Sequence, residues 1–376
     1  MNKSRELLSL FFCFSLFFAG CVAEHKEELP ESEAPAKAEE IEAKGQNDHS
    51  DAVELLSQSG AKLKRDGEGN VTALDMRGMV VENESLEPLS GLSHLESIKV
   101  DNSAITDRSI QYVVSQSKTL RELDLRGCTI SNSAMESIGL CLNLRALRFS
   151  GQSGACTVDD DGLASLAELQ EMRALSLDYL WVSEVGLSHL SMMQELQELN
   201  LAKTLVGDEA LAVLQQHPKL KKLRISQNQV TDAGLEHLVQ ISTLEDLDIS
   251  EDSQISDAGM EHVGKLTNLK KLNLWRVALT DAGVAHLAGL ENLEWLNLDN
   301  TQLSDSGMVH LEGMTKLTFL HLGSTTITDA GLKHLAGLKQ LKDLKVTRTA
   351  VTQAGVDELK KSLPDTNIQL QYLGDE

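Results

Sequence analysis

Apolar residues return along most of the chain at a fixed interval. The pattern L-x-x-L-x-[L/I/V] opens, in steps of 24 or 25 residues, at Leu196, Leu220, Leu244, Leu269, Leu293, Leu317 and Leu341. The same slot is held further upstream by Val71, Leu95, Leu120, Leu144 and Met172, with a short insertion near residues 153–156. A fixed period of this length indicates a stacked repeat architecture. The sequence therefore predicts about twelve repeats between residues 71 and 364.

Within each repeat, the spacing of the apolar residues changes from that of a strand to that of a helix. In the segment 293–298, Leu296 and Leu298 alternate with polar residues, which indicates a strand. In the segment 329–338, apolar residues fall three apart, which indicates a helix. One strand and one helix cannot close a core alone, so neighbouring repeats have to stack. We therefore predict a curved α/β solenoid with a parallel sheet on its concave face and helices on its convex face.

The predicted helices carry residues that suit their ends. Thr328 or Asp329 is a suitable N-cap, and the acidic residue favours the positive end of the helix. Gly337 lies near the other end of this helix, where we expect a left-handed residue. The acidic run at 159–161 occupies the same position in an earlier repeat. We interpret it as an acidic helix N-terminus rather than a calcium site.

These repeats resemble the leucine-rich-repeat superfamily over about four fifths of the chain. Their consensus, L-x-x-L-x-L-x-x-C/T-x-I-T-D-x-G-L, is similar to that of the cysteine-containing, F-box-type class, and such repeats occur in exported bacterial proteins. The chain departs from that class in having no F-box before the repeats. Its cysteine slot is retained at Cys128 but is otherwise mostly polar, with Thr204, Asn228, Thr301, Thr325 and Thr349. We expect these side chains to form a ladder of hydrogen bonds to the backbone inside the turn.

The first residues resemble an export signal. Lys3 and Arg5 precede the apolar run 7–19, which is too short for a comfortable transmembrane helix. The tetrapeptide at 18–21 (FAGC) resembles the lipobox of bacterial lipoproteins, with Phe18 where leucine is usual. The resemblance implies lipid attachment at Cys21 and a place in the cell envelope, periplasmic or at the surface. An ordinary secretory signal or an uncleaved anchor is the alternative.

The segments that flank the repeats differ from them in composition. Residues 21–50 are rich in Glu and poor in large apolar residues, so we predict a disordered, extended tether. Residues 51–76 combine a short helical pattern with a hairpin signal at 66–69, which predicts an N-terminal cap and the first strand. The predicted boundaries are signal 1–20, tether 21–50, cap and first strand 51–76, repeats 71–364 and C-terminal cap 365–376.

Composition and charge exclude several classes of partner. The formal charge of −23 argues against nucleic acid, because phosphate binding needs clustered Lys and Arg. The same charge argues against electrostatic attachment to anionic lipid. Only 3% of the residues are aromatic, so the core has to be aliphatic. We interpret Cys128, Cys141 and Cys156 as small buried thiols, with a Cys128–Cys141 or Cys141–Cys156 disulfide as the alternative.

The sequence contains no pattern that points to an enzyme. A nucleophile elbow, a P-loop, an H-E-x-x-H motif and paired C-x-x-C motifs are absent, so we expect no cofactor. One repeat position is shared by His189, His237, His262, His286, His310 and His334. Neighbouring helices pack about 8–10 Å apart and zinc ligands lie about 2.0–2.1 Å from the ion, so we expect no metal site. We interpret these histidines as packing or capping residues, with a charge column that titrates near about pH 6.5 as the alternative.

Candidate binding residues occupy strand and turn positions that point to the concave face. Three consecutive repeats place there Trp275, Arg276, Trp295, Asp299, Phe319 and His321. Because strands lie about 4.8 Å apart, we expect the three rings to form one exposed patch. Aromatic and Arg side chains dominate binding hot spots, and tryptophan also stacks on sugar rings. Tyr179 and Trp181, beside the irregular repeat, are a second candidate.

We therefore expect a non-catalytic, lipid-anchored monomer that recognises a protein or a glycan through its concave face. The alternative is a structural or spacer protein of the cell envelope without a defined ligand. The sequence does not identify the ligand, because the core positions that define the fold carry no information about what the exposed positions bind.

Overall fold

One continuous sheet runs through the repeats. The computed structural model describes residues 48–101 and 104–371, so the predicted signal, Cys21 and most of the predicted tether lie outside the described residues. Within these ranges, fourteen strands form a single sheet in which each strand pairs with the next along the chain. The first pair is antiparallel and the later pairs are parallel. The strands are β1 (Lys62–Arg65), β2 (Val71–Asp75), β3 (Ser97–Lys99), β4 (Glu122–Asp124), β5 (Ala146–Ser150), β6 (Ala174–Asp178), β7 (Glu198–Asn200), β8 (Lys222–Arg224), β9 (Asp246–Asp248), β10 (Lys271–Asn273), β11 (Trp295–Asn297), β12 (Phe319–His321), β13 (Asp343–Lys345) and β14 (Asn367–Gln369).

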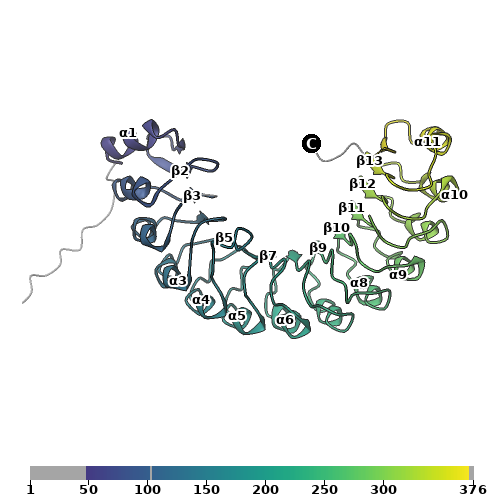
Figure 1. Ribbon diagram of the computed structural model, residues 1–376, viewed down its shortest axis with the longest axis horizontal. Coiled ribbons are helices and arrows are strands. Elements are labelled where there is room, and N and C mark those ends of the chain that lie inside the picture. The colour runs from purple at the N-terminus through teal and green to yellow at the C-terminus, as the bar shows by residue number, and fades with distance from the viewer. Residues whose placement is uncertain (1–47, 102–103, 372–376) are drawn as a thin grey trace, which may run out of the picture. The chain divides into compact units, whose positions relative to one another are not determined.

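Short helices form the second layer. Figure 1 shows the strands on the inner side of the bend of the repeat region and the helices on its outer side. The α-helices are α1 (Ser50–Gln58), α2 (Ile110–Val114), α3 (Asn132–Ile138), α4 (Asp160–Ala164), α5 (Glu184–Ser188), α6 (Asp208–Leu214), α7 (Leu235–Leu238), α8 (Met260–Val263), α9 (Asp281–His286), α10 (Asp329–Leu332) and α11 (Gln353–Lys360). The 3-10 helices are η1 (Asn83–Gly91), η2 (Asp107–Ser109), η3 (Met308–Leu311) and η4 (Lys333–Leu335). The predicted α/β solenoid is confirmed.

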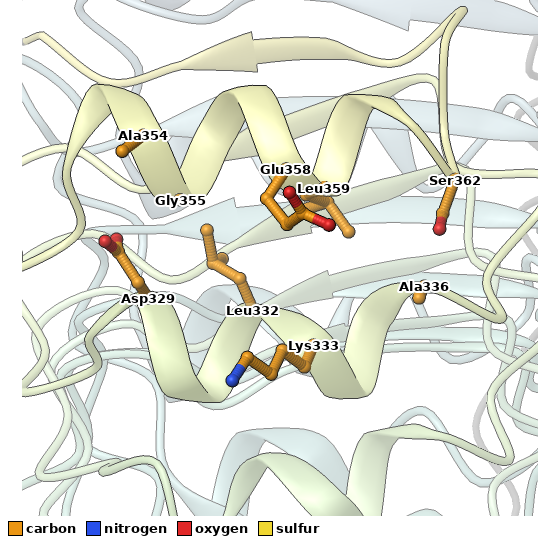
Figure 2. Close-up of a pocket in the computed structure, with 9 residues that line it drawn as sticks. All are labelled: Asp329, Leu332, Lys333, Ala336, Ala354, Gly355, Glu358, Leu359 and Ser362. Carbon is orange, nitrogen blue, oxygen red and sulfur yellow. The ribbon is translucent and has the colours of Figure 1, made fainter.

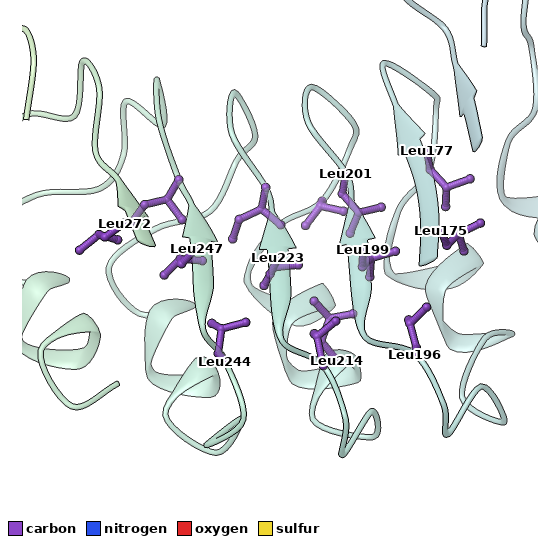
Figure 3. Packing of buried hydrophobic residues seen from close by; sticks show 14 of the residues in the cluster. Leu175, Leu177, Leu196, Leu199, Leu201, Leu214, Leu223, Leu244, Leu247 and Leu272 are labelled. Carbon is purple, nitrogen blue, oxygen red and sulfur yellow. The ribbon is translucent and has the colours of Figure 1, made fainter. Parts of the chain in front are cut away.

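The core between the two layers is aliphatic. Successive strands present leucines to it in register, and these are almost fully buried: Leu175, Leu199, Leu223, Leu247 and Leu272. Figure 3 shows this row together with the leucines that precede the strands, such as Leu196 and Leu244. Replacing a buried leucine by alanine costs about 2–5 kcal/mol. Each repeat is therefore stabilised mainly by its neighbours.

A left-handed residue follows each of the middle and later strands. Its φ lies between 52° and 63° at Tyr179, Lys203, Gln227, Glu251, Arg276, Asn300, Ser324 and Arg348. Gly78 and Gly127 hold the position in earlier repeats, with φ of 75° and 77°. The expectation of a left-handed residue at Gly337 is wrong, because Gly337 has no positive φ and the cap of η4, Ala336, is right-handed with φ −58°. The chain turns after the strand at this left-handed residue. Most repeats have a non-glycine residue there, although the left-handed conformation is energetically unfavourable for such a residue.

The predicted ladder of hydrogen bonds in the polar slot is confirmed. Thr301 Oγ1 donates to Leu298 O at 2.8 Å, and the threonines at 204, 325 and 349 repeat this bond at 3.0, 2.7 and 2.7 Å. Asn228 Nδ2 donates to the carbonyl of Ile225 at 2.8 Å. Cys128 Sγ donates to the carbonyl of Val100 at 2.7 Å. The slot therefore satisfies backbone carbonyls that the turn buries.

Asp252 occupies the same slot in the repeat of β9 but accepts instead of donating. Its buried Oδ1 accepts from Asn228 N at 2.5 Å, and its Oδ2 has no hydrogen-bond partner among the described residues. Burial raises the pKa of this carboxyl to about 8, although the bond from Asn228 N lowers it. The protonated acid therefore predominates at neutral pH.

In most repeats, an aspartate reaches forward to the helix of the next repeat; Asn132 and Glu184 stand at its position in two others. Asp305 accepts from Thr328 N at 2.7 Å and from Thr328 Oγ1 at 2.6 Å. We call this pair of bonds the aspartate clasp; it also joins Asp107 to Ser131, Asp160 to Ser183, Asp208 to Thr231, Asp232 to Ser256, Asp257 to Thr280, Asp281 to Ser304 and Asp329 to Thr352. Thr328 Oγ1 accepts from Ala330 N at 3.1 Å, which confirms the predicted N-cap. The acidic run at 159–161 serves the same purposes: Asp159 is the N-cap of α4.

The glycine of each T-D-A-G segment makes room for the clasp. A Cβ on Gly331 would lie 2.4 Å from Asp305 Oδ1, and one on Gly355 would lie 2.1 Å from Asp329 Oδ1. Figure 2 shows Asp329 at the start of α10, close to Gly355 of α11. In α11, the last helix of the described residues, Gln353 stands where most of the other repeats have the aspartate. The conspicuous T-D-A-G pattern therefore joins repeats as well as capping helices.

The three cysteines of the described residues are buried thiols. Cys128 and Cys141 have no exposed surface, and Cys156 has 5%. Burial raises the pKa of Cys141 and of Cys156 to about 11. These thiols pack as small core side chains, as predicted, and form little of the reactive thiolate at neutral pH.

Candidate functional site

Strands β10 to β13 bring together four side chains on the concave face. The register pairs Lys271 of β10 with Trp295 of β11, and Trp295 with Phe319 of β12. The residue that follows each of them is a buried leucine, so the side chains named here point away from the core. Lys345 of β13 lies on the far side of Phe319. We call Lys271, Trp295, Phe319 and Lys345 the aromatic ladder.

The two rings of the ladder are stacked, and a lysine covers each outer face. The ring centroids of Trp295 and Phe319 are 5.0 Å apart and the ring planes differ by 5°. Lys271 Nζ lies 5.0 Å from the Trp295 centroid, and Lys345 Nζ lies 5.7 Å from the Phe319 centroid. Each contact is a cation–π interaction. The ladder thus presents ring edges and two ammonium groups to a partner, rather than open ring faces.

Trp275 and Arg276 lie in a different row from the ladder. Trp275 follows β10, and the strand residue that is paired with Trp295 is Lys271. The Trp275 ring instead receives the guanidinium of Arg276, which lies 5.4 Å from its centroid and pairs with Glu251 at 3.0 Å. The expectation of one exposed patch of three rings is therefore corrected to a stacked pair and a separate tryptophan. Trp275, Trp295 and Phe319 are all partly buried.

His321 and Asp299 flank the ladder on the same strands. The His321 ring lies edge-on to Phe319, with centroids 6.4 Å apart, and its Nε2 is 4.0 Å from Asp299 Oδ1. Burial lowers the pKa of His321, and Lys345 lowers it further, whereas Asp299 raises it. The imidazole is therefore mainly neutral at pH 7, so the charges beside the rings come from the lysines and from aspartates: Asp299, Asp343, which pairs with Phe319 in the register, and Asp246, 3.6 Å from Lys271 Nζ.

A second feature, which we call the polar groove, opens on the concave face at β5 to β8 and encloses about 730 Å³. Its floor contains Ser176 of β6 and Asn200 of β7, which lie in register between Arg148 of β5 and Arg224 of β8. Two short side chains between two long ones leave the hollow. Ser153, from the insertion predicted in this repeat, contributes to the wall.

Ion pairs hold the charged walls of the polar groove. Arg148 Nη1 donates to Glu122 at 2.7 Å, and Arg224 Nη1 donates to Asp178 at 3.2 Å. Asp178 also accepts from Ala202 N at 2.7 Å. Burial raises the pKa of Asp178, because the groove wall removes water from its carboxyl. These contacts fix the guanidinium and carboxyl groups in place.

Of the groove residues, only Tyr179 was anticipated from the sequence. The sequence signal for the groove is the third position of each strand. A small side chain, Ser176, and one of medium size, Asn200, lie there between the long side chains of Arg148 and Arg224. The other residue of that second candidate, Trp181, is 77% exposed, which makes it the most exposed aromatic residue of the described part. It lies outside the strand, beside Asp159, and apart from the groove lining.

The six aligned histidines lie at the C-terminal ends of their helices. His237, His262, His286 and His310 fall in the last turn of a helix, and His189 is a C-cap. The packing or capping role of these histidines stays a prediction, and the buried Nδ1 of His262 has no hydrogen-bond partner among the described residues. In the described ranges, no three His, Cys, Asp or Glu side chains lie close enough to hold a metal ion.

A third hollow lies on the convex side, between the last two helices. Figure 2 shows it between α10 and α11, with Leu332 and Leu359 in its floor and Lys333 and Glu358 at its rim. It encloses about 320 Å³ and its lining is mainly apolar.

No helix in residues 48–101 or 104–371 is both long and apolar enough to span a bilayer.

Comparison with known proteins agrees with this architecture. Residues 267–327 match a leucine rich repeat model, and residues 116–139 and 216–239 match a second leucine rich repeat model. The fold is similar to that of an internalin (inlF) from Listeria monocytogenes, with a TM-score of 0.60, 20% sequence identity and coverage of 88% of this chain and 96% of that one. An internalin C2 (inlC2) from the same organism is also similar, with a TM-score of 0.44, 24% identity and coverage of 57% and 84%. No curated protein matches the sequence. The chain therefore carries leucine-rich repeats and folds as a leucine-rich-repeat solenoid.

Proposed function

We propose that this protein is a non-catalytic recognition protein of a bacterial cell envelope, and that it binds a protein partner through the aromatic ladder. The observation that carries the proposal is the stacked Trp295–Phe319 pair on the concave sheet, held between Lys271 and Lys345. A preformed aromatic pair loses little conformational entropy on binding, which is the property of a hot spot.

A protein partner fits the ladder better than a glycan does. A sugar ring stacks on an open aromatic face, but in the ladder the outer face of each ring is covered by an ammonium group. The exposed parts are ring edges, which carry partial positive charge, and the two lysines. These groups suit carboxylate and carbonyl oxygens of a polypeptide, and Asp299 beside them suits a cationic side chain.

Export and anchoring form the second part of the proposal. The segment at 18–21 supports lipid attachment at Cys21, and the acidic stretch 21–50 supports a spacer between the membrane and the solenoid. Mass spectrometry of membrane-associated protein should find acyl groups on Cys21, and Cys21→Ser should release the protein into the soluble fraction. Unmodified Cys21 in membrane-associated protein would overturn the anchor without affecting the ladder.

The recognition function is tested by partner capture with matched variants. Photo-crosslinking of the full chain in envelope extract should give a saturable protein partner. The double variant Trp295→Ala/Phe319→Ala should lose that partner, whereas Trp181→Ala, which removes a 77% exposed tryptophan, should retain it. The absence of a saturable partner would favour the spacer alternative. Equal capture by the double variant would place the binding surface elsewhere.

A further inference from the structure

We propose that the polar groove on β5 to β8 is a binding site for an uncharged oligosaccharide, separate from the aromatic ladder. The groove is a hollow of about 730 Å³ on the concave face. A volume of this size accommodates a small-molecule ligand. This site is independent of the protein partner proposed above, because no residue of the ladder lines it.

The charges of the groove cancel, which disfavours an ionic ligand. Its lining contains three guanidinium groups and three carboxyl groups: Arg126, Arg148, Arg224, Asp101, Asp178 and Glu198. The arginines already bind carboxylates, Arg126 to Asp124 at 2.8 Å and the other two as described above. An anionic ligand would have to displace these carboxylates, and the chain's net charge of −23 opposes its approach. A cation would face the three guanidinium groups.

The groove offers both donors and acceptors, which is what hydroxyl groups require. A guanidinium has five N–H donors, and the ion pair of Arg148 with Glu122 uses one of its nitrogens. Ser176 and Asn200 in the floor each donate and accept. A sugar hydroxyl does both as well, so adjacent hydroxyls match alternating polar side chains on strands about 4.8 Å apart.

Partial burial of the groove strengthens these bonds. Asp178 has a side chain that is only 14% exposed, and Ser176 has 6% of its surface exposed. Hydrogen bonds in such a desolvated place are stronger than those at an open surface. Tyr179 stands in the lining, and its ring is held by Lys203 Nζ at 5.5 Å from its centroid. The phenolic hydroxyl of Tyr179 adds a further donor and acceptor to the lining.

The experiment is calorimetric titration of the full-length protein in detergent. The probes are neutral hexasaccharides of glucose in α and β linkage, of N-acetylglucosamine, of xylose and of mannose, together with anionic oligogalacturonate. We expect saturable binding of at least one neutral probe and none of oligogalacturonate. Asn200→Phe should weaken the neutral probe by at least about tenfold, because the ring fills the floor.

Asn297→Phe is the matched control, since Asn297 holds the same third strand position in β11, outside the groove. It should leave sugar binding unchanged. If Asn200→Phe does not fold, Arg148→Gln replaces it, because this variant removes the guanidinium and keeps much of the side chain. Failure of every neutral probe, selective binding of oligogalacturonate, or equal binding by wild type and groove variant would each overturn the proposal. None of these results would bear on the aromatic ladder.

Discussion

The concave face carries two regions that use different positions of the strand for opposite purposes. In the polar groove, the third strand positions hold Ser176 and Asn200 between two arginines, and the surface is hollow. In the aromatic ladder, the first positions of β10 to β12 hold Lys271 and the two stacked rings, Lys345 from the third position of β13 lies against Phe319, and the surface is filled. Beneath both regions lies a row of buried leucines, and aspartate clasps join most of the repeats that carry them. We call the buried leucines and the aspartate clasps the frame. The difference shows that the frame fixes the positions of the exposed side chains, whereas the identity of the exposed residues alone determines what they contact.

The largest expected effect comes from cutting the frame between the two regions. Asp232 accepts from Ser256 N at 2.8 Å and from its Oγ at 2.6 Å, so it clasps the repeat of β9 onto that of β8. Asp232→Ala leaves a partly buried N–H without this acceptor. We expect a loss of about 3 kcal/mol in the free energy of unfolding, measured by urea denaturation. Glu236→Ala, an exposed change in the same repeat, should cost less than about 0.5 kcal/mol.

A cut of this kind also tests whether the two regions unfold together. If the clasp couples them, the variant should show two transitions, followed separately by fluorescence in one background that keeps only Trp181 and in another that keeps only Trp295. A single transition at the wild-type denaturant concentration would show that the leucine core alone carries the coupling.

Asp252, which lies between the regions, should lower the free energy of unfolding of the wild-type protein at alkaline pH. Its pKa is about 8 in the folded state against an ordinary value of 3.8, so the folded state holds a proton that the unfolded state releases. The contribution of protonated Asp252 to the free energy of unfolding is therefore fully present below about pH 4 and is lost as the pH rises through 8. Asp252→Asn should remove this slope and add about 2 kcal/mol at pH 8. Parallel wild-type and variant curves of Tm against pH would contradict the assignment.

His217 should produce the opposite pH dependence on the groove side. It is buried, its Nδ1 lies 3.2 Å from Met193 O, and burial lowers its pKa, although the hydrogen bond that Met193 O accepts from it raises the pKa. The unfolded state then binds a proton more readily than the folded state. Stability contributed by neutral His217 is present above about pH 6.5 and falls in acid. His217→Asn should reduce the loss of stability between pH 7 and 5 by about 1 kcal/mol, and a Tm unaffected by the change across that range would refute this.

The smallest expected effect is the stacking energy of the ladder itself. A double-mutant cycle on Trp295→Leu and Phe319→Leu should give a coupling energy of about 0.5–1.5 kcal/mol in urea unfolding. The corresponding cycle on Trp181→Leu and Phe319→Leu should give none, because these residues belong to distant repeats. A zero coupling energy for the first pair would mean that the rings are neighbours without mutual stabilisation.

The frame was predictable because its positions repeat, and the candidate site was less so because its positions do not. The period of the leucines, the N-cap at Thr328 and the polar slot at Thr301 follow from local chemistry and are confirmed. The clasp escaped prediction, because an aspartate at a helix start has a sufficient local explanation and its partner lies 23 residues further on. The row of Trp275 was misjudged, because Trp275 lies beyond the end of β10, four residues after Lys271, which is the residue that pairs with Trp295. The polar groove depends on small residues, whose importance lies in the space that they leave.

Because each aspartate of the clasp binds the repeat that follows it, the joints between repeats all point in the same direction along the chain. A module that runs from one aspartate to the residue before the next contains both halves of the joint, because each aspartate of the clasp receives the Ser or Thr of the following repeat. Removing or duplicating such a module leaves every remaining joint complete. The array can therefore change length by whole units, and the distance between the polar groove and the aromatic ladder can change with it, without any alteration to either surface. Gln353 marks the end of the series, where the chain of joints stops in the last described helix.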